Sequence, residues 1–383
     1  MKVLMVVPGV LPFHTGGGVA EVNWAILKEL RARGHRVMVM PPHDKVNPRA
    51  VADIEAIGAE VGTGWESADI QAAALAWLPD ALYCYSMSAL QRTHLIRGIP
   101  RMVVVGDLDH QVPLYRRQYY LRSQPITYPE LAQLHNQAML IKESVLPSLQ
   151  QCEAVVCNCF HHSQWLTQMG VDNQYVPNPV ADPMPDGWVR KAFPNNVWPR
   201  VSMAGHLGGI ATLSGLYFLA EDMMPYWRGL ECEIRIAGAE ELYPDLATRL
   251  MPYMGEGGPV HLLGYVDDIQ QEMMDCEVFL VTTPIDLGVR TRIIDAWALG
   301  CCVVTHTANL AGFEPGELLH GVNCLVGGTG KEIVAQIKQA LASKELRMQL
   351  GQRGRETYEK HHRSAAGKTV DLIESLCRAE VMA

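Results

Sequence analysis

The chain has 383 residues, a formal net charge of −9 at pH 7 and ten cysteines. Single hydrophobic cores stop growing at about 250–300 residues, so this length predicts two domains. The negative charge gives no general attraction to nucleic acid or to anionic membranes, which would need a local basic patch. With 48% hydrophobic and 19% charged residues, the chain is expected to be globular rather than disordered.

The apolar run at residues 3–7 is too short for the core of a signal peptide. No stretch approaches the roughly 18 apolar residues of a membrane span. The cysteines lie mostly in apolar runs and form no C-x-x-C pair, so we expect buried thiols in a reducing compartment. The sequence therefore predicts a cytoplasmic protein.

The first forty residues predict a strand, a glycine loop, a helix and a second strand. Residues 3–7 are a short β-branched run, residues 19–30 carry apolar side chains at helical spacing, and Gly34 ends that helix before the apolar run 37–40. Further short runs predict strands at residues 81–85, 102–105, 154–157 and 174–176. This alternation is typical of a parallel sheet covered by helices on both faces.

A proline-rich stretch, residues 179–199, interrupts this pattern and divides the chain. Beyond it the alternation resumes, with strands predicted at 201–204, 232–237, 260–263, 278–281, 302–305 and 323–326. We therefore expect an α/β protein with domains at 1–183 and 184–360, and a C-terminal helix within 361–383 that packs toward the first domain.

Three glycine loops follow predicted strands, at the edge of a sheet where backbone N–H groups and helix N-termini approach anionic ligands. They are residues 16–18, 205–209 and 286–292. None has the G-x-G-x-x-G spacing of dinucleotide sites or the Gly-Lys-Ser/Thr ending of a P-loop, which disfavours both classes. For residues 16–18, a tight turn required by helix packing is an equally good interpretation.

The loop 286–292 is the most informative, because Arg290 and Arg292 flank the predicted start of a helix. Fixed cations beside helix N–H groups suit a diphosphate. Asp295 lies on the same helical face as Arg292, where its carboxylate could accept hydrogen bonds from a ribose. An ordinary surface pair between Arg292 and Asp295, worth about 0.2–0.5 kcal/mol, is the alternative.

His110 follows the predicted strand 102–105, with Asp107 and Asp109 beside it. A histidine at the ligand edge of a sheet is a candidate acid or base, although a solvated loop histidine has the same sequence context.

Cys157, Cys159, His161 and His162 raise the question of a metal site. Adjacent histidine side chains are expected to diverge, and the cysteines lie in or beside a predicted strand. We therefore predict no metal site here.

Taken together, these segments resemble the retaining GT-B glycosyltransferases often called family 4, or glycosyl transferases group 1, over nearly the whole chain. The strongest match is residues 291–304, which are similar to the family's donor-site helix and strand. The other similar segments are Gly17-Gly18-Val19, Gly34-His35-Arg36-Val37, Gly98-Ile99-Pro100, Val176-Pro177-Asn178-Pro179, Ile236-Ala237-Gly238, Gly264-Tyr265-Val266, and residues 321–326 and 351–355.

The resemblance implies two doubly wound Rossmann-like domains facing each other across a cleft, with the acceptor on the first and the nucleotide sugar on the second. It implies a retaining hexosyl- or pentosyltransferase that uses a UDP-, GDP- or other nucleoside diphosphate sugar without a cofactor or metal. The residues it assigns are His110, Asp109 and Asp107 as catalytic; Gly17, Gly18, Gly288, Val289, Arg290 and Arg292 at the diphosphate; Asp295, Gly264 and Tyr265 at the nucleoside; and His206, Asp286 and Leu287 at the sugar or phosphates.

The chain departs from the family pattern at three places. The usual Glu-x7-Glu pair falls on Leu287 and Asp295, so Asp286 is the candidate for the first carboxylate. The usual basic pair falls near His206 and Ser214, which leaves the phosphates to Arg290 and Arg292. The usual loop histidine aligns with Gly106, so Asp109 or His110 is expected to replace it.

Two other functions stay open. A nucleotide-sugar 2-epimerase or hydrolase would need no acceptor, and a non-catalytic subunit would keep only donor binding. The acceptor and the oligomeric state are not readable, and nothing favours nucleic acid. The basic-aromatic stretch at residues 115–120 suggests either a peripheral contact with a membrane surface or phosphates, or a partly exposed helix.

Overall fold

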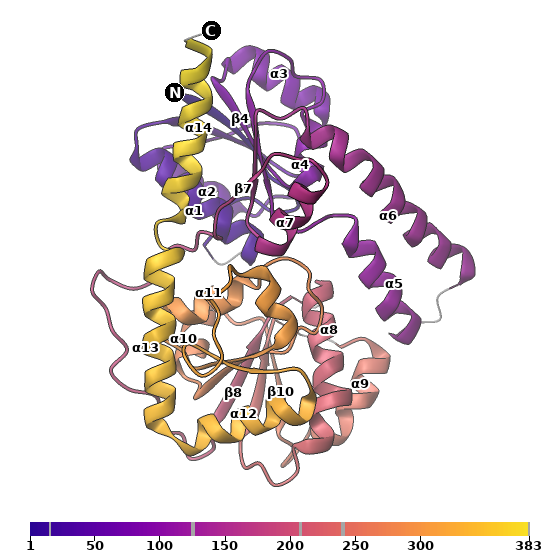
Figure 1. The fold of residues 1–383 in the computed structure, drawn as a ribbon, viewed down its shortest axis with the longest axis vertical. Coiled ribbons are helices and arrows are strands. Elements are labelled where there is room, and N and C mark those ends of the chain that lie inside the picture. Colours follow the sequence, from indigo (N-terminus) through magenta and orange to yellow (C-terminus); the bar gives the residue numbers. More distant parts are fainter. Residues whose placement is uncertain (15–16, 124–126, 207–208, 239–241, 382–383) are drawn as a thin grey trace. The chain divides into compact units, whose positions relative to one another are not determined.

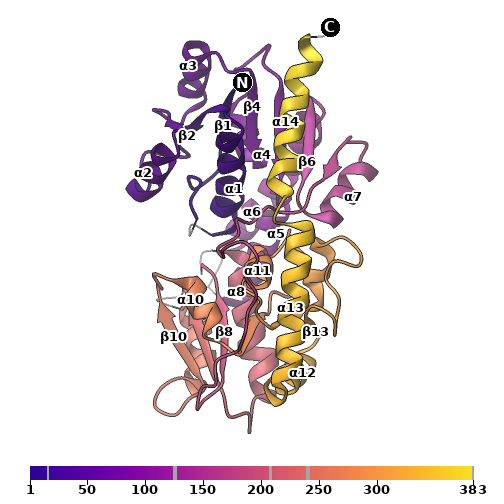
Figure 2. The same ribbon diagram turned by 90° about the vertical axis from the view of Figure 1, so that its left-hand side faces the viewer.

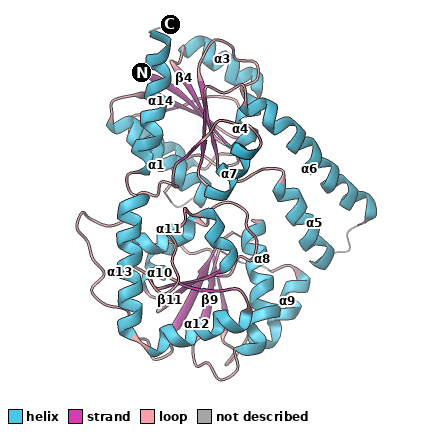
Figure 3. Ribbon diagram, in the orientation of Figure 1, coloured by secondary structure: helices cyan, strands magenta, loops and turns pink. Residues whose placement is uncertain are grey.

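The computed structural model describes residues 1–14, 17–123, 127–206, 209–238 and 242–381, and this part of the chain forms two compact units (Figures 1 and 3). Unit 1 contains Met1–Gln111, Gln137–Ala181 and His362–Ala383. Unit 2 contains Val112–Asn136 and Asp182–His361. Each unit is an α/β domain with its own parallel sheet and core.

In its described residues, unit 1 has a seven-stranded parallel sheet in the order β3-β2-β1-β4-β5-β6-β7. The strands are β1 (Lys2–Val6), β2 (Arg36–Met40), β3 (Glu60–Val61), β4 (Ala81–Tyr85), β5 (Arg101–Val105), β6 (Ala154–Cys157) and β7 (Gln174–Tyr175). The side chains of β1, β4, β5 and β6 are nearly all buried, as coverage of both faces by helices requires, whereas the edge strands β3 and β7 are partly exposed. The sequence missed β3, because two residues are too few to show a period.

The helices of unit 1 are α1 (Gly18–Ala32), α2 (Pro48–Ala56), α3 (Ser67–Trp77), α4 (Ser86–Arg92), α7 (Phe160–Gln168) and α14 (Ala365–Val381). The last of these packs against α1, β4 and β6 (Figures 1 and 2). Arg33, the C-cap of α1, pairs with Asp371 of α14 at 2.6 Å, and His35 contacts Glu374 of α14 at 2.8 Å. The end of the chain is therefore part of the unit formed by its beginning.

The described part of unit 2 has a six-stranded parallel sheet in the order β10-β9-β8-β11-β12-β13. The strands are β8 (Arg200–Ala204), β9 (Glu233–Ala237), β10 (Val260–Gly264), β11 (Val278–Val281), β12 (Val303–His306) and β13 (Leu325–Gly327). The α-helices are α8 (Ile210–Phe218), α9 (Pro244–Leu250), α10 (Ile269–Met274), α11 (Thr291–Ala298), α12 (Gly330–Ala342) and α13 (Lys344–His361). Short π- or 3₁₀-helical segments are η1 (Leu219–Met223), η2 (Met224–Tyr226), η3 (Met251–Tyr253) and η4 (Thr307–Gly312).

Two further helices follow β5 before the chain returns to β6. Helix α5 (Gln111–Ser123) groups almost entirely with unit 2, and α6 (Tyr128–Leu149) is divided between the units at Asn136. Tyr119 of α5 is buried in the core of unit 2, where its ring centroid lies 5.9 Å from that of Tyr217. Residues 112–136 come before the domain boundary that the sequence predicts at 183, yet they belong to unit 2. The packing of their side chains, and not their position in the chain, assigns them to that unit.

Both sheets have the doubly wound strand order, in which the direction of winding reverses between β1 and β4 and between β8 and β11. Open parallel sheets bind ligands outside the carboxyl ends of the strands at this switch point. The fold therefore marks one candidate binding position on each unit.

Two sequence predictions about environment can be compared with the structure. The ten cysteines are free thiols, all buried except the half-buried Cys152 and Cys377. Among the helices that the structure describes, none is both long enough and apolar enough for a bilayer span.

Candidate functional site

Three glycines form a close-packed row at the carboxyl ends of β8, β9 and β10. The N–H of Gly205 donates to the carbonyl of Ala237 at 3.1 Å, and the N–H of Gly238 donates to that of Gly264 at 2.7 Å. A Cβ atom on Gly238 would lie 2.8 Å from the carbonyl oxygen of Gly205. The strand ends are too close together for any side chain at these positions. Because no side chain covers the main chain here, a ligand can approach the backbone directly.

Arg292 lies at the switch point of unit 2. From α11 its guanidinium donates to the carbonyl of Ala204 at 2.5 Å and to Oγ1 of Thr212 at 3.0 Å. A Cβ on Gly205 would lie 2.7 Å from its Nη1. Burial, and after it the charge of Arg290, lower the pKa of Arg292 to about 10, against an opposing effect of Asp295. The side chain is still a cation at pH 7, and an anion beside it would relieve the cost of its burial.

The backbone just before α11 is fixed by packing. Leu287 and Gly288 are buried, Gly288 has φ +64°, and Arg290 is the N-cap residue with only 8% of its surface exposed. A Cβ on Gly312 of η4 would lie 2.9 Å from the carbonyl oxygen of Gly288. Val289 is partly buried in the same turn. The N-terminus of α11 is thus held rigidly beside two arginines.

The other predicted donor-site residues lie on loops at the same edge of the sheet. Gly264 ends β10, and the next residue, Tyr265, exposes 67% of its surface. His206 follows β8 and is exposed, whereas Leu207 and Gly208 of the same loop lie outside the described residues. Asp295 is half-buried on α11, one turn from Arg292. The structure thus places His206, Gly264 and Tyr265 at the carboxyl ends of β8 and β10, and Asp295 on α11.

Tyr115 of α5 is a residue that sequence reasoning did not assign to this site. Its hydroxyl donates a hydrogen bond to the carboxylate of Asp286, which is exposed after β11. Burial and this bond raise the pKa of Tyr115 well above its usual value. The signal in the sequence was the aromatic stretch at residues 115–120, which gave no indication of its partner. Of that stretch, the side chain of Tyr120 lies outside the described residues.

In unit 1, the loop after β5 is buried rather than solvated. His110 exposes 7% of its surface, its ring centroid lies 5.4 Å from that of Trp165, and burial lowers its pKa. No described residue forms a hydrogen bond with its Nδ1. Burial therefore favours the neutral imidazole of His110 and leaves its Nδ1 without a hydrogen-bond partner among the described residues.

Asp109 lies in the same loop and has a perturbed carboxyl group. Burial and the charge of Asp107 raise its pKa to about 6, against hydrogen bonds from the backbone of Ser88 and Met87. Those two residues lie in the first turn of α4, so Asp109 satisfies N–H groups at that helix start. A carboxyl group that titrates near neutrality can exchange a proton in the physiological range.

Ser86 is a second residue that the sequence did not reveal. It directly follows β4 at the switch point of unit 1 and has φ +74°, which is uncommon for a residue other than glycine. Its Oγ lies 2.9 Å from that of Ser88. The strained turn presents two hydroxyl groups beside the loop of Asp109.

The glycine loop of unit 1 includes an acidic residue that we did not predict. Gly17 is the N-cap of α1 with φ +83°, and Gly18 begins the helix; Thr15 and Gly16 lie outside the described residues. Glu21 accepts a hydrogen bond from the backbone of Gly17, and burial raises its pKa to about 7. The N-terminus of α1 is therefore already in contact with a carboxyl group of its own helix.

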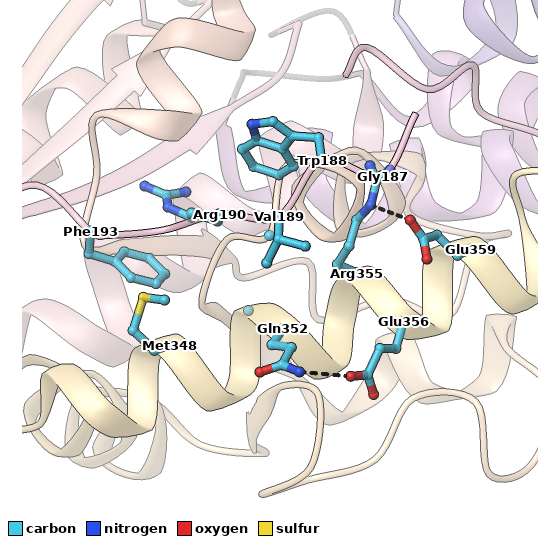
Figure 4. Close-up of a pocket in the computed structure, with 12 residues that line it drawn as sticks. Gly187, Trp188, Val189, Arg190, Phe193, Met348, Gln352, Arg355, Glu356 and Glu359 are labelled. Carbon is cyan, nitrogen blue, oxygen red and sulfur yellow. Dashed lines mark hydrogen bonds and ion pairs between the residues drawn. The ribbon is translucent and has the colours of Figure 1, made fainter. Parts of the chain in front are cut away.

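A cavity of about 160 Å³ lies between the segment 187–193 and α13 (Figure 4). Its wall includes Gly300, which precedes β12 and so lies at the edge of the sheet opposite to Arg292. Its two arginines make structural contacts: Arg190 covers the ring of Phe193 at 4.0 Å, and Arg355 pairs with Asp182 at 2.6 Å. None of the predicted site residues lines this cavity, so we do not assign the donor to it.

Two family models match this chain, one in each half of the sequence. Residues 199–343 match the family model described as glycosyl transferases group 1, and residues 2–169 match the one described as starch synthase catalytic domain. No curated protein matches the chain.

Several solved structures have a similar fold. A glycosyltransferase from Rickettsia africae superposes with a TM-score of 0.69 at 12% identity, covering 98% of both chains. HepE from Anabaena, in complex with UDP and glucose, gives 0.69 at 14% identity and covers 98% of this chain and 100% of its own. Sucrose-phosphate synthase from Thermosynechococcus elongatus gives 0.69 at 14%, with 99% of each chain covered.

Proposed function

Because residues 199–343 match the model of group 1 glycosyl transferases and the chain has the GT-B fold, we propose that it transfers a sugar from a nucleoside diphosphate sugar to an acceptor with retention of the anomeric configuration. The observation that carries the proposal is the half-buried Arg292, which joins the first turn of α11 to the end of β8, with the buried Arg290 two residues before it. A fixed, largely desolvated cation pair at a switch point suits a diphosphate.

In the proposed reaction, negative charge develops on the nucleoside diphosphate as the bond to the sugar breaks. Arg290, Arg292 and the N–H groups that follow Gly288 stabilise this leaving group, since cations and dipoles fixed before the reaction need no reorganisation. Asp295 accepts hydrogen bonds from the ribose, and Tyr265 beside Gly264 lies against the base.

The remaining assignments concern the sugar. His206, Asp286 and Leu287 contact the sugar or the phosphates from the donor side. Gly17 and Gly18 present backbone from unit 1, and the neutral His110 offers its Nδ1 to a sugar hydroxyl. Asp109 and Asp107 supply carboxylates, and the charge of Asp107 contributes to the raised pKa of Asp109. These cations and hydrogen-bond donors belong to the protein, so the proposed mechanism assigns no step to a metal.

The first test is calorimetric titration with UDP, GDP, ADP, TDP and their sugars in the presence of EDTA. HepE was solved with UDP-glucose, which makes that donor the first to try. Arg290→Ala is expected to weaken binding of the preferred nucleotide by at least tenfold, because a charge-assisted contact to phosphate is worth about 1.5–3 kcal/mol. Arg353→Ala, at an exposed ion pair on α13, is the matched control and should bind normally. Equal affinities for both variants would contradict the phosphate assignment.

The alternatives are separated by their products. An epimerase or hydrolase would change or release the sugar of a bound nucleotide sugar without any acceptor. A non-catalytic subunit would bind the nucleotide and leave it intact with every acceptor tried. Transfer to an acceptor with the donor's anomeric configuration, followed by NMR of the product, distinguishes the proposed reaction from both.

A further inference from the structure

Three metal-ligating side chains gather at the carboxyl end of β6 in unit 1. Cys159, His161 and His162 each offer one ligand atom, and these atoms all lie within 4.8 Å of one another. Sγ of Cys159 lies 4.0 Å from Nδ1 of His161, and the two imidazole centroids are 4.6 Å apart. The sequence led us to expect diverging histidines. The first turn of α7 instead brings them together, because Cys159 is its N-cap and the histidines follow in the same turn.

The set of donor atoms suits a zinc ion. One thiolate and two imidazoles are ligands that zinc prefers, whereas magnesium and calcium require oxygen atoms. With Zn–S near 2.3 Å and Zn–N near 2.0–2.1 Å, a tetrahedral ion holds sulfur and nitrogen about 3.6 Å apart. The observed 4.0 Å between Cys159 and His161 is within a few tenths of an ångström of that separation.

The surroundings enclose two of the three ligands and orient one imidazole. Cys159 and His162 are fully buried, while His161 is half-buried and gives an entry route. Nδ1 of His162 lies 3.3 Å from the carbonyl oxygen of Gly106, the kind of outer contact that orients a metal-binding imidazole.

We propose that Cys159, His161 and His162 bind one zinc ion, with a fourth position open to water or another small ligand. Through His162 the site is connected to Gly106, the first residue of the loop that carries Asp109 and His110. The bound ion therefore steadies that loop from outside it. The site contains none of the residues assigned to the donor, so this proposal does not depend on the proposed sugar transfer.

The test is titration of the EDTA-treated and desalted full chain with Co²⁺, whose spectrum reports the ligands of a zinc site. We expect saturation at one Co²⁺ per chain, with a sulfur-to-cobalt charge-transfer band in the near ultraviolet and strong visible bands of a tetrahedral ion. Added Zn²⁺ should remove both sets of bands. Absence of a charge-transfer band at one equivalent of Co²⁺ would overturn the proposal.

Substitutions identify the ligands. Cys159→Ser should abolish the charge-transfer band, and His161→Asn should weaken Co²⁺ binding at least tenfold, since even loss of an outer contact costs roughly 10–100-fold in affinity. Cys152→Ser and His94→Asn, a half-buried cysteine and an exposed histidine of unit 1, are the controls and should bind as the parent chain does.

A band that survives in Cys159→Ser, or that is lost equally in Cys152→Ser, would place the metal elsewhere and refute the assignment. Circular dichroism of each variant shows whether it is folded. His161→Asn is the decisive variant if Cys159→Ser does not fold, because the imidazole of His161 is half-exposed and outside the core.

Discussion

At the scale of single residues, burial rather than pairing sets the chemistry of the candidate sites. Glu21, Asp109 and His110 all have pKa values displaced toward the neutral form, and the first cause in each case is loss of water. The pKa of Arg292 is also shifted toward the neutral form, but it stays far enough above 7 for the guanidinium to remain charged. The sequence identified His110, Asp109 and Arg292 as candidates, because they follow strands. It gave no sign of Glu21, since a glutamate in the first turn of a helix is ordinary.

Glu21 should make unit 1 less stable as pH rises. Its pKa is raised from 4.5 to about 7, so the folded chain binds this proton more tightly than the unfolded chain. The stabilisation of the fold that comes from protonated Glu21 is complete below about pH 4.5. It is lost progressively as the pH rises to about 7, and the loss is at most roughly 3 kcal/mol of the free energy of unfolding. In Glu21→Gln, the fall in melting temperature between pH 5 and pH 8 should become smaller.

Glu55→Gln, an exposed glutamate on α2, is the control and should keep the fall seen in the parent chain. Because the pKa of Asp109 is also raised, its deprotonation destabilises the fold as pH rises as well. The melting temperature of Glu21→Gln is therefore still expected to fall somewhat between pH 5 and pH 8. Parallel curves for the parent chain and Glu21→Gln would contradict the assignment.

At the scale of elements, the donor edge of unit 2 is built by loops that touch. Gly205, Gly238 and Gly264 bring three strand ends into backbone contact, and Arg292 joins α11 to β8 and α8. Each loop was visible in the sequence as a glycine after an apolar run. Their contacts were not, because the order of strands in a sheet is a property of the fold.

Gly238 tests this backbone contact. An alanine at position 238 would have to adopt φ +88°, which is unfavourable for any residue with a side chain. Its Cβ would also lie 2.8 Å from the carbonyl oxygen of Gly205, which is too close. Gly229→Ala is matched, with φ +77° and open space around the Cβ. We expect Gly238→Ala to cost about 1–3 kcal/mol more than Gly229→Ala, measured by thermal unfolding, and to weaken nucleotide binding as well. Equal losses of stability would mean that the loops can separate freely.

Tyr115 tests the connection between α5 and the donor loop. Tyr115→Phe removes the hydroxyl that donates to Asp286 and leaves the ring in place. One hydrogen bond to a charged group contributes about 1.5–3 kcal/mol, and the exposure of Asp286 puts the effect at the lower end. We expect the KM for the donor to rise by up to about tenfold. Tyr128→Phe, at an 85% exposed ring on α6, should leave it unchanged.

At the scale of the whole molecule, two separate cores imply more than one unfolding transition. One core contains residues from both ends of the chain, since Ala365, Val370 and Ile373 of α14 pack with β1 and α1. The other contains the second sheet together with Tyr119 of α5. Proteins of two domains commonly depart from two-state unfolding, so a single free energy would not describe this chain.

Ile373→Ala should lower one calorimetric transition selectively. The side chain is fully buried in the core of unit 1, and such a truncation typically costs about 2–5 kcal/mol. The transition of unit 2 should keep its temperature, and the nucleotide should raise only that transition. Lys368→Ala, exposed on the same helix, should change neither. A uniform shift of both transitions in Ile373→Ala would contradict independent cores.

The sequence by itself determined the class of fold and most of its strands. Short apolar runs such as residues 81–85 and 278–281 become β4 and β11, because a strand buried on both faces must be apolar throughout. It also located Arg290, Arg292 and Asp295, since their spacing around a helix start is a local property.

Only the tertiary structure decided what depends on residues far apart in the chain. It placed α5 with unit 2 and Tyr115 against Asp286, and it set α14 into the core formed by the first strands. It also set Nδ1 of His162 against the carbonyl oxygen of Gly106. Burial and close contact arise when segments distant in the chain pack against one another. The sequence alone does not show which segments do so.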